Sequence, residues 1–287
     1  MDWLATLYAV PLYAVAALSV GLAVYTWRRR GTSGAGAMTV FLLALALWSV
    51  GAGLGISAAG LPAKVLWGRL EYLGIVAVPP AWLVFVLQYT GRQRWLTPTR
   101  GALLYGVPLV TWVLFWTNGA HGLMWGEVRL DDALPFPSLE VVEYGAWFWI
   151  HSAYSYALMF VSAALLVSTL LRRSRLYRVQ SAVFLGALLI PLSANAWYIF
   201  GFSPIPDLDP TPFAFSISGV LTVWGLFRFR LLDLIPVARG AVIEGMRDGV
   251  IVADRYDRIV DLNPAAQEIL GYPPSKAVGQ DLDKCTG

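Results

Sequence analysis

Seven stretches of this sequence are long and apolar enough to cross a lipid bilayer. A transmembrane helix needs about 20 mainly apolar residues, because the hydrocarbon core is about 30 Å thick and a helix rises about 1.5 Å per residue. The stretches are residues 3–27, 37–59, 65–89, 101–117, 145–171, 179–201 and 212–229. Only 14% of the 287 residues are charged, whereas soluble domains contain about a quarter. The sequence therefore predicts an all-α polytopic membrane protein built as a seven-helix bundle.

Basic residues are concentrated in every second connection between these stretches. They follow the first, third, fifth and seventh stretches: Arg28, Arg29, Arg30, Arg92, Arg94, Arg100, Arg172, Arg173, Arg175, Arg178, Arg228 and Arg230. Cytoplasmic loops of membrane proteins carry an excess of Lys and Arg. We therefore predict a multi-pass protein of the cell membrane with its N-terminus outside and its C-terminus in the cytoplasm. Because the basic residues follow the topology, we expect lipid and not nucleic acid as the partner.

Several polar side chains fall inside the apolar stretches or just before them, where their burial is costly and marks candidate functional sites. Eight lie near the predicted outer ends of the third, fifth, sixth and seventh stretches: Arg69, Glu71, Tyr72, His151, Tyr154, Asn195, Tyr198 and Asp209. Each is predicted to lie within about 10 Å of the outer surface. Two interpretations stay open: a pocket for an unidentified small molecule, or hydrogen bonds and ion pairs that only hold the helices together.

The longest predicted outer loop, residues 118–144, is acidic and contains Trp125 and two prolines. It is either a lid over the pocket or a solvated loop without a ligand role.

Other classes of seven-helix or intramembrane protein do not fit. A retinal protein needs a lysine inside the last helix, but the lysines are Lys64, Lys276 and Lys284. The sequence has no His-Glu-x-x-His motif, which excludes that type of metalloprotease. Two histidines and a single cysteine, Cys285, predict neither a metal site nor a disulfide. No cofactor is expected in this chain.

The sequence changes character after residue 230. Residues 249–254 and 258–262 are rich in β-branched side chains and predict two strands joined by a short turn. Asn263 is a good N-cap, Pro264 suits the first helical position and Gly271 ends the helix that follows. About forty residues are too few for a complete domain core.

Residues 244–272, followed by Val278 and Gly279, resemble the beginning of a PAS domain. In that family a first hairpin leads through an Asn-Pro-Ala motif into the first helix, and Asn263, Pro264 and Ala265 match this motif. The later helix and the remaining three strands of the family are absent from this sequence. The resemblance therefore implies a short α/β segment that is an incomplete PAS domain.

A second resemblance rests on motifs that occur in order along the membrane part. They are residues 69–72, 79–82, 89–91, 154–156, 195 with 198, 209–212 and 227–237. With these motifs the chain is similar to the seven-helix N-terminal sensor region of membrane histidine kinases. The resemblance implies a receptor that passes an external or intramembrane signal to a cytoplasmic output.

Together these features divide the chain into three parts. Residues 1–230 are the predicted seven-transmembrane sensor domain, residues 231–247 a cytoplasmic connector helix and residues 248–287 the N-terminal part of a PAS domain. Candidates for signal transmission are Arg228, Arg230, Asp233 and Asn263. We expect a homodimer formed through the cytoplasmic region.

The predicted function is the input region of a sensor histidine kinase or a related signalling protein. No histidine follows His151, and the tail has no glycine-rich nucleotide motif, so no catalytic residue is expected in this chain. The alternative is a small-molecule transporter with a regulatory tail, in which helices kinked by prolines line a pathway.

Overall fold

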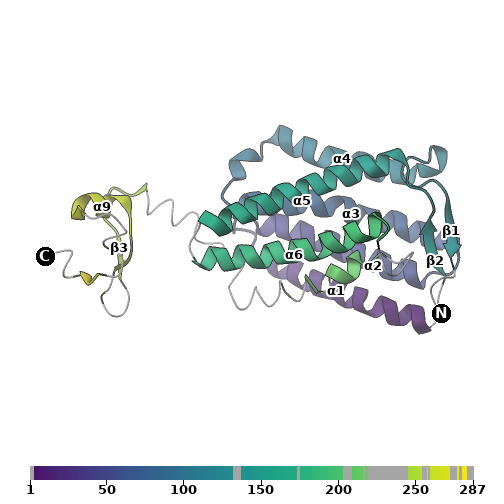
Figure 1. Ribbon diagram of the computed structural model, residues 1–287, viewed down its shortest axis with the longest axis horizontal. Helices are drawn as coiled ribbons and strands as arrows, with labels where there is room; N and C mark the ends of the chain where they lie inside the picture. The colour runs from purple at the N-terminus through teal and green to yellow at the C-terminus, as the bar shows by residue number, and fades with distance from the viewer. Residues whose placement is uncertain are drawn as a thin grey trace. The chain divides into compact units, whose positions relative to one another are not determined.

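The computed structural model of the protein describes residues 3–131, 137–172, 175–202, 209–215, 217–218, 221, 245–253, 257, 259–271, 277 and 280–282. The chain divides into two compact units, Met1–Asp233 and Leu234–Gly287. The helices of the first unit lie alongside one another (Figure 1). They are α1 (Trp3–Arg28), α2 (Ala35–Ser57), α3 (Leu61–Tyr89), α4 (Pro98–Trp116), α5 (Ala146–Arg172) and α6 (Arg175–Ile199).

Five of these helices have the length and hydropathy of membrane spans, within Ala5–Arg28, Ala35–Ser57, Leu61–Tyr89, Ala146–Leu171 and Arg178–Ile199. These five predicted spans are confirmed. The fourth predicted stretch forms a helix, α4, which does not meet the same criteria. The seventh, residues 212–229, lies mostly outside the described residues. The described part of the chain therefore supports a multi-pass membrane protein and leaves the count of seven spans a prediction.

Helix α4 covers one side of the bundle and exposes apolar side chains. Leu103 is 71% exposed and Leu109 is 61% exposed. A soluble protein would rarely present such a surface on one helix, whereas a helix that faces lipid does.

Close packing of α2 against α3 depends on two glycines. A Cβ atom on Gly51 would lie 2.7 Å from the Cβ of Glu71, and one on Gly74 would lie 2.5 Å from the carbonyl oxygen of Ala44. Contacts this short are not tolerated between real atoms, so both positions require glycine at this helix separation. Small residues allow transmembrane helices to approach in this way.

Residues 118–144, which the sequence predicted only as a loop, contain regular structure. A 3-10 turn, η2 (Asn118–Ala120), precedes β1 (Val128–Asp131) and β2 (Ser138–Val141), which pair antiparallel with Arg129 opposite Glu140. The hairpin lies at the end of the bundle where α1 begins (Figure 1). The Asn118 side chain holds the segment that leads into this hairpin. Its Nδ2 donates to the carbonyl oxygen of Trp125 (2.7 Å), and its Oδ1 accepts from the amide of Met124 (2.9 Å).

The second unit contains β3 (Ile251–Ala253), β4 (Ile259–Leu262) and α9 (Pro264–Leu270), and the two strands pair antiparallel. Asn263 caps α9 by accepting a hydrogen bond from the amide of Ala266 (2.9 Å), and Gly271 ends the helix at φ +70°. The predicted hairpin, cap and stop are confirmed. The side chains of Ile259, Leu262 and Ala266 form part of its core. Arg228, Arg230 and Asp233 lie outside the described residues.

Candidate ligand-binding site

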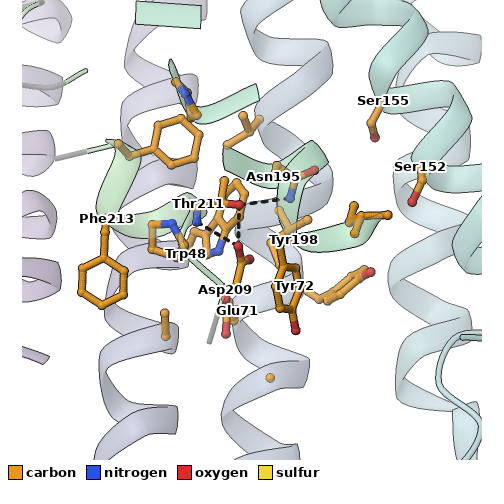
Figure 2. Close-up of a pocket in the computed structure, with 18 of the residues that line it drawn as sticks. Trp48, Glu71, Tyr72, Ser152, Ser155, Asn195, Tyr198, Asp209, Thr211 and Phe213 are labelled. Atoms are coloured by element: carbon orange, nitrogen blue, oxygen red, sulfur yellow. Dashed lines mark hydrogen bonds between the residues drawn. The ribbon is translucent and has the colours of Figure 1, made fainter. Parts of the chain in front are cut away.

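The first unit contains a cavity of about 290 Å³. Its walls come mainly from α2, α3, α5 and α6, from residues 137–141 and from residues 209–215. Figure 2 labels lining residues of these four helices and of residues 209–215. Small-molecule sites in proteins usually have volumes of roughly 300–1,000 Å³, so the cavity is suited to a small ligand. Six of the eight residues predicted from the sequence line it: Glu71, Tyr72, His151, Asn195, Tyr198 and Asp209.

The other two predicted residues, Arg69 and Tyr154, do not line the cavity. The guanidinium carbon of Arg69 lies 5.8 Å from the centre of the Trp116 ring, a cation–π contact with α4. The hydroxyl of Tyr154 donates to the carbonyl oxygen of Leu104, also on α4. Residues two positions apart on a helix point to different sides, which is why Arg69 faces α4 while Glu71 faces the cavity.

A directional hydrogen-bond chain crosses one wall of the cavity. Tyr156 donates its hydroxyl proton to Asn195 Oδ1 (2.8 Å), and Asn195 Nδ2 donates to Thr211 Oγ1 (3.1 Å). Thr211 in turn donates from its hydroxyl and its backbone amide to Asp209 Oδ1. Figure 2 shows the hydrogen bonds that run from Asn195 through Thr211 to Asp209. Three separate segments, α5, α6 and residues 209–215, are thereby joined at the cavity.

Glu71 lies next to Asp209 in the cavity (Figure 2), close enough for the two carboxyl groups to interact electrostatically. The indole Nε1–H of Trp48 interacts favourably with Glu71 but lies outside hydrogen-bond geometry. Tyr72 packs its ring on Phe115 with centroids 4.1 Å apart. Glu71 has no cationic partner among the described residues. Its position is set by the packing of α3.

His151 belongs to a buried polar cluster on the α4 and α5 side. Thr111 donates its hydroxyl proton to the carbonyl oxygen of Val107 (2.8 Å) and accepts from Trp147 Nε1 (2.9 Å). Because that proton is used, His151 Nδ1, 3.4 Å from the Thr111 hydroxyl oxygen, is the donor in this pair. Its Nε2 then accepts from the Ser155 hydroxyl (3.3 Å). This histidine has hydrogen bonds at both ring nitrogens and ties α5 to α4.

The segment before α5 supplies part of the cavity wall. Trp125, Ser138 and Tyr144 all line the cavity. Trp125 also packs edge-on against Phe115, with ring centroids 4.6 Å apart. The predicted outer loop is thus in part a wall of the candidate site.

Comparison with known protein families gives two matches. Residues 11–236 match the family described as the N-terminal 7TM region of histidine kinase. The chain belongs to this family. Residues 241–286 match the PAS domain family. No curated protein and no solved structure matches the chain.

This histidine-kinase sensor region is therefore the input part of a membrane signalling protein, as the two resemblances predicted. The comparisons give no support to the transporter alternative, because the two matched families are a histidine-kinase sensor region and a PAS domain.

Several polar residues that line the cavity of the sensor region were not among the predicted site residues, and Lys64, Trp48 and Thr211 are examples. Lys64 was read as a loop residue, but α3 begins at Leu61, and the Lys64 ammonium donates to the carbonyl oxygens of Gly55 (2.9 Å) and Ile56 (3.2 Å) at the end of α2. Trp48 carried no sequence signal, because aromatic residues are common in apolar helices. Thr211 did have a sequence signal, because Asp-Pro-Thr-Pro at residues 209–212 resembles a capped helix start.

Proposed function

We propose that the first unit detects a stimulus in its cavity and transmits it to the PAS domain of a sensor histidine kinase. This proposal rests on one observation: the residues that line the cavity come from several helices and from the segment that leads toward the PAS domain. One occupant would contact four helices and also residues 209–215, which lead along the chain toward the segment matched to the PAS family at 241–286.

A ligand shifts a conformational equilibrium only if it binds one arrangement more tightly than the other. The hydrogen bonds from Asn195 to Thr211 and from Thr211 to Asp209 offer such a difference, because an occupant that contacts Asp209 would favour one position of residues 209–215. Movement of residues 209–215 would then pass through Arg228, Arg230 and Asp233 to Asn263, at the start of the PAS helix. The partners in this scheme are an unidentified stimulus and, through the cytoplasmic region, a second copy of the chain.

The topology belongs to the same proposal. We place the N-terminus outside and the C-terminus in the cytoplasm, with α4 and residues 212–229 as the two further spans. The domain limits are then residues 1–230 for the sensor, 231–247 for the connector helix and 248–287 for the beginning of the PAS domain. The alternation of basic connections supports this arrangement.

Insertions in the connector test the coupling. Alanines are added one at a time between residues 237 and 246 of the full-length kinase, and autophosphorylation is measured in membranes. If a helix transmits the signal, each insertion rotates the output by about 100°, and activity varies with a period of about 3.6 residues. The same insertions between Arg30 and Gly31, in an exposed turn, are the control and leave activity unchanged. A constant activity across the connector series would contradict helix-transmitted coupling.

A further inference from the structure

The cavity holds two acidic side chains that have no cationic side chain paired with them among the described residues. Glu71 and Asp209 both line it, and within the described residues neither has an ion-pair partner. The nearest candidates on α3 are used elsewhere: Arg69 lies over Trp116, and Lys64 donates to the last carbonyls of α2. Two half-buried carboxylates that share a site without a cation are unfavourable, so the site favours a positively charged occupant.

Hydrogen-bonding capacity is also left over on this wall. Asp209 uses Oδ1 to accept from Thr211, while its Oδ2 has no hydrogen bond within the described part of the chain. Tyr72 is only 5% exposed, and its hydroxyl also has no hydrogen bond to a described residue. With the two oxygens of Glu71, the wall offers three carboxylate oxygens. That number equals the three N–H donors of a protonated primary amine.

Aromatic rings surround these carboxylates. Trp48, Tyr72 and Tyr198 lie beside Glu71 and Asp209 (Figure 2). The faces of aromatic rings attract cations, most strongly when the cation is desolvated. Ser152 and Ser155 of α5 lie across the cavity from the carboxylates (Figure 2), where they can meet a polar group at the far end of a ligand.

A bare metal ion does not suit this site, whereas an organic cation does. The described residues contain no group of three or more His, Cys, Asp or Glu side chains able to hold a metal. A cavity of about 290 Å³ also leaves most of its apolar wall unfilled around a single ion, whereas an organic ligand would cover it.

We propose that the cavity binds a small protonated primary amine, with its ammonium group between Glu71 and Asp209 and its apolar body among the aromatic rings. This inference rests on the proposed function, in which the same cavity is the input site. It adds the chemical class of the stimulus. The amine would supply the missing charge and would fill the carboxylate oxygens that the side chains leave free.

Thermal unfolding of the whole chain in lipid nanodiscs tests this proposal. The probes are a series of primary amines from methylamine to phenethylamine, and 2-phenylethanol is the neutral counterpart of the largest. We expect phenethylamine to raise the Tm by about 5 °C or more at roughly a hundredfold excess over its Kd. The alcohol should have no comparable effect. Equal shifts with amine and alcohol, or no shift with any amine, would overturn the proposal.

Two variants locate the charge. Glu71→Gln and Asp209→Asn keep the shape of each side chain, and the amide oxygen introduced by Asp209→Asn can still accept from Thr211. Each variant is expected to weaken amine binding roughly tenfold or more, because the ammonium group then faces one carboxylate instead of two. The control is Glu127→Gln, which removes an exposed carboxylate that does not line the cavity. Amine affinity that is unchanged in Glu71→Gln and Asp209→Asn would contradict the assignment.

The outcomes also separate this inference from the proposed function. Amine binding without any change in autophosphorylation would support the proposed ligand class and contradict the proposed coupling to the kinase. A chain that binds no amine but gains Tm on acidification, with the gain lost in Glu71→Gln, would mean that the two carboxylates share a proton. That result would overturn the amine site and leave the connector experiment unaffected.

Discussion

The backbone of Glu71 lies directly against Gly51, so closely that a Cβ atom at position 51 would sit 2.9 Å from the Glu71 Cα. This contact fixes the height and rotation of Glu71 relative to α2. It also holds α2, with Trp48, beside the cavity. A glycine that looks like ordinary helix packing therefore positions one of the two carboxylates of the candidate site.

Gly51→Ala should move α2 away from α3 or strain both helices. Overpacking of this kind costs about 1–3 kcal/mol, which should appear as a lower Tm in nanodiscs. The control is Gly106→Ala in α4, where an added Cβ meets nothing within 4 Å. If the two substitutions lower the Tm equally, the contact between Gly51 and Glu71 does not limit stability.

Thr211→Val removes the hydroxyl that joins Asn195 to Asp209 while keeping the shape of the side chain. The Asn195 amide then loses its acceptor, while Asp209 keeps only the hydrogen bond from the backbone amide of residue 211. Each lost hydrogen bond of this kind costs about 0.5–1.5 kcal/mol. The Tm should fall. Thr211→Ser keeps the hydroxyl and should retain most of the stability. A valine variant as stable as the serine variant would show that water replaces the hydroxyl.

Asn263→Ala should loosen the second unit. The Asn263 side chain accepts from the amides of Val250 (2.8 Å) and Ala266 (2.9 Å) and donates to the carbonyl oxygen of Asp248 (2.8 Å). Loss of an N-cap alone costs about 0.5–2 kcal/mol. Hydrogen exchange at the amides of Val250 and Ala266 should accelerate by about tenfold.

Asn263→Asp is the matched variant, because a carboxylate oxygen can still accept from both amides. Only the hydrogen bond to Asp248 is lost, so exchange at the two amides should be intermediate between wild type and the alanine variant. If the alanine variant exchanges at the wild-type rate, the side chain does not hold β3 to α9.

Membrane orientation can be read from cysteine labelling, since Cys285 is the sole cysteine of the sequence. In a Cys285→Ser background, Glu127→Cys and Arg94→Cys each place one thiol at an exposed position. A membrane-impermeant maleimide should label position 127 in intact cells and position 94 only after the membrane is opened. The reverse pattern would place the N-terminus in the cytoplasm.

Local sequence determined much of the fold. Long apolar runs identified α1, α2, α3, α5 and α6, because the thickness of the bilayer sets the length of any spanning helix. The cap at Asn263 and the stop at Gly271 were readable for a similar reason: both depend on a few adjacent residues. The resemblance to the sensor family was also readable, from short motifs that occur in order along the chain, and the family match over residues 11–236 confirms it.

The tertiary structure decided which polar residues share the cavity. Helical periodicity separates Arg69 from Glu71, but it does not say which neighbouring helix each residue faces. That depends on the close contact of α2 with α3 at Gly51 and Gly74. The same packing turns Lys64, a loop residue by sequence, into a donor for the end of α2. A side chain's neighbours across helices are set by how whole surfaces fit together, and one segment read alone does not contain that information.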